Sequence, residues 1–243
     1  MDVKSSPAAA HPYGDPVLVL ALDTATPAVT AGVVELEAGS PPRTLAQRVT
    51  VNAKAHGELL TPHLTEALAE AGRALSDVDA IVVGAGPGPF TGLRVGLVTA
   101  AALGHALDRP VHPVATTDAL AHDAATGAPL LVATDARRRE VYWAAYDADG
   151  RRTHGPDVER PAELAGKLAD LGLAQAVGEG AALYADVLGL PVLDGHAHPS
   201  PAGLVAAAAD ALLSGAEPAP LTPLYLRRPD AVEPTGRKRV TRP

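Results

Sequence analysis

Cysteine is absent from this chain of 243 residues, and large side chains are scarce, with one phenylalanine, one tryptophan and one methionine. Without cysteine there can be no disulfide, iron–sulfur cluster, thiolate zinc site or cysteine nucleophile. Because aromatic residues make up 3% of the chain, the core has to be built from alanine, valine and leucine, which lets helices pack closely. Hydrophobic residues reach 47%, enough for a sizeable core in one compact unit or two small lobes.

Long hydrophobic runs and excess positive charge are also missing. No stretch reaches the roughly 18 uninterrupted apolar residues of a membrane-spanning helix, and residues 1–16 lack the apolar segment of an export signal. The formal net charge of −8 argues against a chain that binds nucleic acid with its whole surface. We therefore expect a soluble cytoplasmic protein that does not bind a membrane.

The predicted elements describe two similar halves. An apolar run at 17–22, a polar turn at 23–27 and a valine-rich strand at 29–36 predict a hairpin. The run at 130–134 and the strand at 140–146, around the turn 135–139, repeat that pattern. The other predicted strands are 45–51, 81–84 and 110–114, and the predicted helices are 56–72, 92–107 with Thr91 as its cap, 117–125, 161–171 and 201–213.

These elements suggest a division into lobes with loose ends. The chain is expected to consist of a disordered leader 1–16, an amino-terminal lobe 17–109 joined by a carboxyl-terminal helix 201–226, a second lobe 110–200, and a disordered tail 227–243. The tail carries six basic and two acidic residues, so it either contacts RNA or an acidic partner, or is a solvated terminus.

A turn with a carboxylate and two hydroxyls follows the first strand. Its polar side chains are Asp23, Thr24 and Thr26. A turn of this kind can bind phosphate through backbone N–H groups while the carboxylate holds Mg²⁺ through water. Ala25 and Pro27 stand where a glycine and a backbone donor would help, so the alternative is a turn that satisfies only its own backbone.

A glycine- and proline-rich loop, 84–89, leads from a strand into the second long helix. This is the usual place of an anion site at a helix amino terminus, but no Gly-Lys-Ser/Thr follows and its two prolines lack N–H donors. Such a stiff loop suits a docking surface as well as a ligand site. Phe90, directly after the loop, either fills the core or faces a partner.

Histidines do not form a recognisable metal motif, and we expect no metal site. His56 and His63 lie seven residues apart on one predicted helix, about 10 Å by helix rise, too far to ligate one ion. His196 and His198 lie beside Asp194 in a loop, either as a loose metal site or as surface histidines. No Gly-x-Ser-x-Gly nucleophile motif accompanies the serines. No catalytic residue is assigned.

Several motifs occur in an order that matches one protein family. They are residues 20–26, 56–60, 84–94, 95–97, 135–137, 140–144 and 223–227. Together they resemble the TsaB (YeaZ, glycoprotease-like) family of tRNA threonylcarbamoyladenosine biosynthesis proteins. The most specific block is Gly-Pro-Gly-x-Phe-Thr-Gly-x-Arg, in which this chain has Pro89 where the family usually has serine.

The resemblance implies an α/β fold of the actin-like, sugar-kinase-like (ASKHA) kind, with two lobes that each hold a mixed sheet and flanking helices. It implies a role in the N6-threonylcarbamoyladenosine (t6A) modification of tRNA adenosine 37, as the non-catalytic partner of the transferase TsaD in a heterodimer. The ATPase TsaE belongs to the same assembly, a homodimer is a further possible state, and tRNA is reached through the complex.

The catalytic paralogue carries a His-x-x-x-His metal pair, and the matching stretch here, 114–120, has none. The resemblance therefore implies a chain that has lost the chemistry, with no tightly bound cofactor and with ATP and Mg²⁺ only in the assembled complex. It places the pairing face on the helices that begin near His56 and Thr91. The expected interface residues are His56, Leu60, His63, Leu64, Phe90, Thr91, Leu93, Arg94, Leu97, Ala101 and Gly104. The alternative is that this apolar stripe packs into its own lobe.

Two other functions stay open. A kinase or carbamoyltransferase of the same fold would hold ATP and Mg²⁺ on Asp23, Thr24, Thr26 and the loop 178–180, and calorimetry with ATP would detect it. A metallopeptidase would carry stoichiometric zinc.

Overall fold

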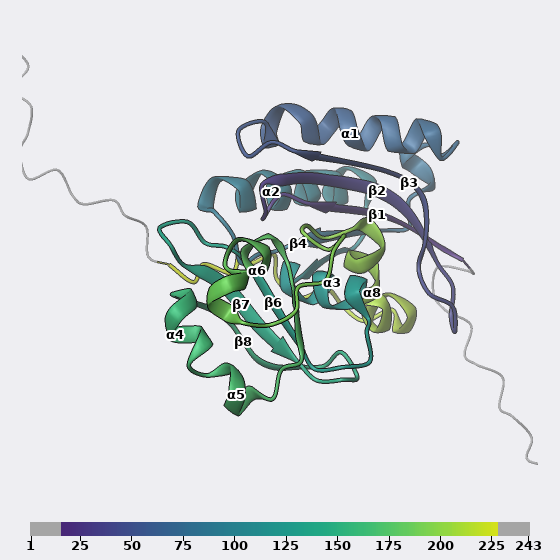
Figure 1. Ribbon diagram of the computed structural model, residues 1–243. Helices are drawn as coiled ribbons and strands as arrows, with labels where there is room; N and C mark the ends of the chain where they lie inside the picture. Colours follow the sequence, from purple (N-terminus) through teal and green to yellow (C-terminus); the bar gives the residue numbers. More distant parts are fainter. Residues whose placement is uncertain (1–15, 228–243) are drawn as a thin grey trace, which may run out of the picture.

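In the computed structural model, which describes residues 16–227, the chain forms two lobes that lie side by side (Figure 1). The first lobe holds a five-stranded sheet of order β3-β2-β1-β4-β5, and the second a four-stranded sheet of order β8-β7-β6-β9. Both sheets mix parallel and antiparallel pairs. The predicted two-lobed α/β architecture is confirmed.

The strands are β1 (Val17–Asp23), β2 (Ala28–Leu36), β3 (Arg43–Val51), β4 (Ala80–Gly84), β5 (Val111–Val114), β6 (Leu130–Asp135), β7 (Val141–Tyr146), β8 (Arg152–Glu159) and β9 (Gln175–Val177). The helices are α1 (His56–Glu70), the 3-10 turn η1 (Leu75–Asp77), α2 (Phe90–Leu107), α3 (Thr116–Ala124), α4 (Pro161–Ala165), α5 (Leu168–Leu171), α6 (Glu179–Leu183), α7 (Ala185–Leu188) and α8 (Pro201–Ser214).

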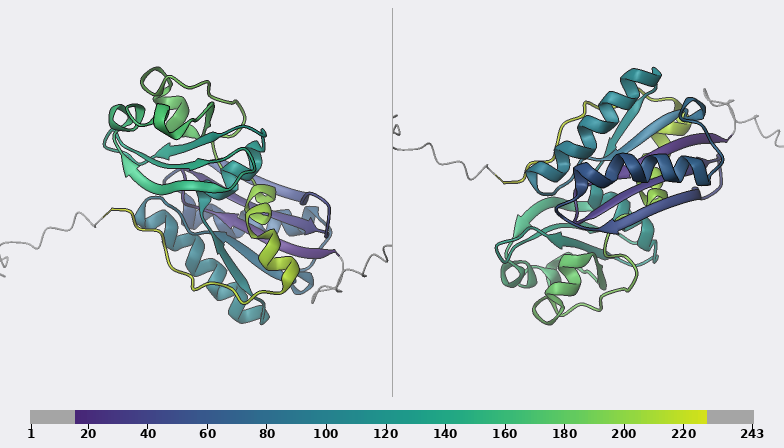
Figure 2. Two further views of the ribbon diagram at one scale, coloured as in Figure 1. Left: turned by 90° about the horizontal axis from the view of Figure 1, so that it is seen from below. Right: turned by 90° about the horizontal axis from the view of Figure 1, so that it is seen from above.

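Strand β1 is apolar throughout because both faces of the first sheet are covered. Helices α1 and α2 pack on one face, and α8 packs on the other (Figure 2). All seven residues of β1 are buried, as expected for a central strand with a helix layer on each side. The predicted hairpin of β1 and β2 is confirmed, with Val19 opposite Val34.

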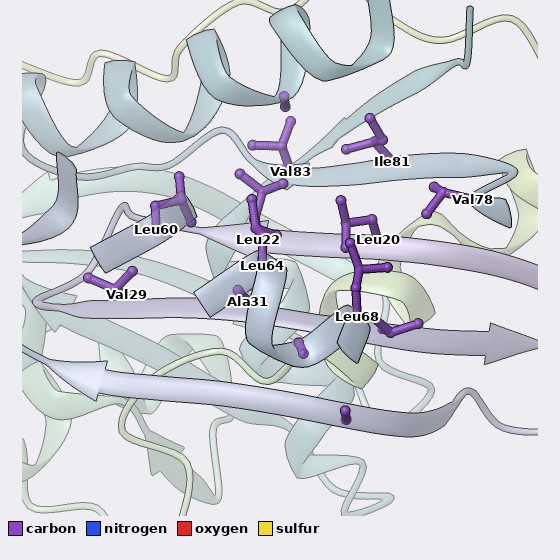
Figure 3. Packing of buried hydrophobic residues seen from close by; sticks show 14 of the residues in the cluster. Leu20, Leu22, Val29, Ala31, Leu60, Leu64, Leu68, Val78, Ile81 and Val83 are labelled. Carbon is purple, nitrogen blue, oxygen red and sulfur yellow. The ribbon is translucent and has the colours of Figure 1, made fainter. Parts of the chain in front are cut away.

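The inner side of α1 belongs to the core of the first lobe. Leu60, Leu64 and Leu68 are spaced by four residues and therefore share one side of the helix. They lie against Leu20 and Leu22 of β1, and all five are buried (Figure 3). The apolar stripe that predicted this helix thus serves the packing of the chain itself.

Several predicted boundaries were wrong. The first lobe was expected to end at residue 109, but β5 pairs in parallel with β4 and extends the first sheet to Val114. Helix α2 begins at Phe90 after an extended Pro89, so Thr91 is an exposed residue of its first turn and not its cap. The predicted helix 201–226 ends at Ser214, where Gly215 adopts a left-handed conformation.

The second lobe differs most from its predicted form. Strand β8 was missed because it is polar, carries Gly155 and Pro156, and lies at the edge of its sheet, where neither apolar alternation nor a complete set of donors is required. The predicted helix 161–171 is divided into α4 and α5. The expected leader and basic tail lie outside the described residues, apart from Pro16 and Arg227.

Among the described residues, α2 alone is long and apolar enough to cross a membrane by length and composition, with a mean hydropathy of 1.3. Its inner residues, such as Leu97 and Ala100, pack in the core beneath the first sheet. A third of the helix is buried, so small apolar residues also face outward. This composition therefore reflects one side that packs in the lobe and a second apolar side that is open.

Candidate functional site

The Asp23 carboxylate lies enclosed where β1, β4 and α3 meet. Its Oδ1 accepts a hydrogen bond from the backbone N–H of Ala25 at 2.8 Å, and its Oδ2 accepts one from the Thr116 hydroxyl at 2.6 Å. A Cβ on Gly84 would lie 1.7 Å from Oδ2, so no larger residue fits beside it. Asp23 is fully buried. The carboxylate therefore serves the backbone and Thr116 and is not presented to a ligand.

Helix α2 is seated directly on this turn. The Thr24 hydroxyl donates to the carbonyl oxygen of Gly92 at 2.7 Å and accepts from the N–H of Gly96 at 2.9 Å. These two backbone groups would otherwise bond to each other in an α-helix, so the hydroxyl is inserted into the helix. A Cβ on Gly92 would lie 2.4 Å from the Thr24 carbonyl oxygen. The first turns of α2 thus occupy the space through which a phosphate group would approach.

Thr26 completes the closed turn. Its hydroxyl accepts from the N–H of Ala28 at 3.2 Å, and its carbonyl oxygen lies 2.9 Å from Nε2 of His56 at the start of α1. Asp23, Thr24 and Thr26 are brought together, as the sequence predicted, but all three are buried and paired within the chain. The residues of this turn do not fit a nucleotide with its metal ion.

Burial raises the pKa of Asp23 to about 6 from a usual value near 3.8, although hydrogen bonds from Thr116 and Ala25 oppose the shift. The folded chain therefore binds the proton of the Asp23 carboxyl group more tightly than the unfolded chain does. This difference stabilises the folded state by about 3 kcal/mol below about pH 4, and the stabilisation is lost as the pH rises through 6.

An uncharged amide at this position avoids that loss. We expect Asp23→Asn to raise the free energy of unfolding at pH 8 relative to the unmodified chain, with the difference shrinking towards pH 5, because Oδ1 can still accept from Ala25. Urea unfolding at both pH values measures this, with Asp186→Asn on an exposed part of α7 as the control. A difference that is the same at both pH values contradicts it.

The loop 178–180, the other half of the alternative ATP site, lies at the end of β9. Burial, and then the nearby Asp135, raise the pKa of Glu179 to about 7. Its buried Oε1 has no hydrogen-bond partner among the described residues. Asp135 lines a cavity of about 150 Å³ at the cleft between the lobes, together with Thr26, His56 and Arg137. This part of the cleft is small, and polar and apolar side chains both line it.

Six of the eleven predicted interface residues lie inside the first lobe, which corrects their assignment to a partner-facing surface. Leu93 is fully buried, and the Nε2 of His63 lies 2.9 Å from the Thr50 hydroxyl. The apolar stripe of an amphipathic helix packs on the sheet of its own lobe as the chain folds, whether or not a partner is present. The six buried residues are Leu60, His63, Leu64, Leu93, Leu97 and Gly104.

The other five predicted residues reach the surface. Phe90, Thr91, Arg94 and Ala101 are exposed on α2, and His56 is half-buried at the start of α1.

An outward surface of α1 and α2, missed by the sequence reasoning, lies beside them. Val98 is 66% exposed, the highest fraction among the large apolar residues of the described chain, and Ala102 follows one turn later. A groove of about 110 Å³ runs between the two helices, with Thr61, Thr65 and Leu103 among its lining residues. We call Thr61, Thr65, Val98, Ala102 and Leu103 the α1–α2 face.

The carboxyl-terminal segment was expected to be helical and instead crosses both lobes. The N–H of Leu224 donates to the Ala85 carbonyl oxygen at 2.8 Å in the first lobe. Arg227 donates to the Ala136 carbonyl oxygen at 2.7 Å in the second lobe and forms an ion pair with Glu140. The segment therefore ties the second lobe to the first across the cleft.

The histidine motifs do not gather into a ligand set. Within residues 16–227 no group of three or more His, Cys, Asp or Glu side chains is placed to hold a metal ion. Burial lowers the pKa of His198. His196, His198 and Asp194 are therefore not placed together as a set of ligands.

Comparison with known families gives a specific match. The sequence model of a protein family described as tRNA N6-adenosine threonylcarbamoyltransferase (TsaD) matches residues 45–219, more than half of the chain. An uncharacterised protein of Mycobacterium tuberculosis is 54% identical over 215 residues, which cover 88% of this chain and 93% of that protein. A similar protein of Mycobacterium leprae is also 54% identical, and this chain spans 56% of its length.

Named relatives and solved structures agree with this match. The tRNA threonylcarbamoyladenosine biosynthesis protein TsaB of Escherichia coli is 34% identical over 151 residues, 58% of this chain and 60% of that protein. YeaZ from Pseudomonas aeruginosa has a TM-score of 0.69 and 31% identity, covering 86% of this chain and all of that one. The expected two-lobed α/β fold is thus that of the solved YeaZ structures.

Proposed function

The chain belongs to the TsaB (YeaZ) family of tRNA threonylcarbamoyladenosine biosynthesis proteins, and on that premise we propose that it is the non-catalytic partner of a TsaD-type transferase. The observation that carries the proposal is the closed Asp23 turn. The Thr24 hydroxyl is bonded into α2, and the Asp23 carboxylate is used up by Ala25 and Thr116. With this turn closed, the contribution of the chain to t6A formation is made through its surface.

The α1–α2 face supports a heterodimer. Val98 and Ala102 leave apolar area open on α2, and the groove between α1 and α2 offers space for side chains of a facing helix. The transferase family model itself matches this chain, so the partner shares its fold and carries equivalent helices. Two related surfaces can then meet around an approximate two-fold axis, the usual geometry of dimers. The same face would serve a homodimer when no transferase is present.

The remaining features of the proposal follow from the assembly. The complex includes a TsaE-type ATPase, acts in the cytoplasm, and meets tRNA through both subunits. ATP and Mg²⁺ are bound by the other subunits, because the residues of the Asp23 turn do not fit them.

The test is reconstitution with the transferase from the same genome. The two chains are expected to co-purify, and threonylcarbamoylation of tRNA should require both. The isolated chain should neither modify tRNA nor hydrolyse ATP. Modification or ATP turnover by this chain alone, or full transferase activity without it, would overturn the proposal.

A further inference from the structure

A cavity lined by aromatic and basic side chains opens at the mouth of the cleft. Its volume is about 360 Å³, and three separate parts of the chain line it. They are the end of the glycine–proline loop with Phe90, the β6–β7 turn with Arg137 and Arg138, and the carboxyl-terminal segment with Tyr225 and Arg227. Both lobes therefore contribute, at a place separate from the closed Asp23 turn.

Two aromatic rings form a platform at this cavity. Phe90 is 43% exposed and stacks on Tyr225, which is 41% exposed, with ring centroids 5.1 Å apart. The Arg94 guanidinium lies 3.6 Å from the Phe90 centroid and donates to the Tyr225 hydroxyl at 3.0 Å. The one phenylalanine of a chain so poor in aromatic residues is thus fixed at the surface. A flat apolar face is ready there for another planar group.

Positive charge gathers beside the platform. Arg137, Arg138 and Arg139 all have left-handed backbone conformations, with φ of 61°, 57° and 62°, which residues other than glycine adopt reluctantly. The Asp135 carboxylate supports the turn by accepting from the Arg137 N–H at 2.9 Å. This strained turn carries three consecutive arginines, although the net charge of the chain is −8. Such a local concentration of positive charge suits an anionic ligand.

Three carboxylates among residues 16–227 interact with this turn or with Arg227. Glu140 forms an ion pair with Arg227, Asp135 supports the turn, and Glu179 interacts with Arg137. No carboxylate of residues 16–227 lines the cavity itself. The basic side chains of Arg137, Arg138 and Arg227 therefore line the cavity without a described carboxylate between them.

We propose that this cavity binds an unpaired nucleotide of RNA, with its base on the Phe90–Tyr225 platform and its phosphates on Arg137 and Arg138. Proteins recognise unpaired RNA by stacking its bases on aromatic and arginine planes and by pairing its backbone with basic residues. A free nucleoside triphosphate fits less well, because the described part of the lining offers no carboxylate for its metal ion. The proposal rests on the proposed function, which makes tRNA the RNA concerned.

The test uses the full chain and a fluorescein-labelled 17-nucleotide anticodon stem-loop, titrated in anisotropy at 0.1 M KCl. Tyr225→Ala should raise the dissociation constant at least tenfold. The double variant Arg137→Ala with Arg138→Ala should do the same and reduce the slope of log K against log salt by about 1.4. The matched control is Arg151→Ala with Arg160→Ala, two exposed arginines at the other end of the β6–β7 hairpin and after β8, with an expected change below twofold.

Every outcome decides the assignment. Cavity variants that bind like the unmodified chain overturn it, as does equal affinity for a fully paired duplex of the same length. Displacement of the RNA by millimolar ATP, together with loss of ATP binding in Tyr225→Ala, assigns the cavity to free nucleotides instead. Co-purification of the same variants with the transferase separates the two proposals, since RNA binding is measured on the chain alone.

Discussion

Val98→Glu is expected to abolish association with a TsaD-type transferase and to leave the fold of this chain unchanged. Val98 is 66% exposed, so the carboxylate is solvated in the free chain. In the complex the carboxylate would be buried against apolar side chains, and burying a charge without an opposite charge beside it costs several kcal/mol. We expect the dissociation constant to rise at least 100-fold, equivalent to about 2.7 kcal/mol. Ala102→Arg, one helical turn further along α2, should have a similar effect.

The chain offers matched controls for both variants in its second lobe. Val187 of α7 is 47% exposed and Ala182 of α6 is exposed, so Val187→Glu and Ala182→Arg make the same chemical changes away from the α1–α2 face. Association is measured by calorimetry with the purified transferase, and the fold by circular dichroism. If Val98→Glu and Val187→Glu bind the transferase equally well, the α1–α2 face is not the interface.

A second consequence concerns the oligomeric state of the isolated chain. If the same face serves a homodimer, Val98→Glu should also make the isolated chain monomeric at concentrations where the unmodified chain pairs. Sedimentation of the two proteins in parallel therefore reports on the face without the transferase. A homodimer that survives the substitution would place the self-contact elsewhere.

The sequence was sufficient for the parts of the fold that depend on local patterns. The unbroken apolar run of β1 marked a strand buried on both faces, and the leucines of α1 marked an amphipathic helix. Periodicity identifies an apolar stripe but not what covers it. The family resemblance assigned Leu60 and Leu97 to a partner and left packing in their own lobe as the alternative, and the sheet of that lobe covers them.

The site depends on contacts between distant residues, which no local pattern encodes. The Thr24 hydroxyl enters α2 between Gly92 and Gly96, about 70 residues further on. Arg94 and Tyr225 are separated by 131 positions. The sequence placed the polar residues of the Asp23 turn correctly, but only the packing of α2 closes that turn. The exposed Val98 carried no signal, because a valine in an apolar helix is expected inside.

Leu93→Glu, a few residues before Val98 on the same helix, is expected to unfold the chain. Leu93 has no exposed surface. Its side chain packs so closely on Gly86 that a Cβ added to that glycine would lie 2.9 Å from a Leu93 methyl group. A carboxylate there has no partner, and burying an unpaired charge in place of a core leucine removes about 4 kcal/mol or more. This is a large share of the 5–15 kcal/mol that stabilises a typical domain. Urea unfolding followed by circular dichroism measures the loss.

Leu93→Met provides the control, because a swap of similar volume keeps the apolar contacts and should cost less than about 1.5 kcal/mol. The contrast between Leu93→Glu and Val98→Glu separates the two sides of α2. The inner side packs in the core of the lobe, and the outer side carries the proposed contact with the transferase. A Leu93→Glu chain that stays folded and loses only its transferase would reverse this assignment and return the buried stripe to the interface. Loss of the fold with Leu93→Glu alone, beside a folded Val98→Glu that no longer binds, is the result that the packing of α2 requires.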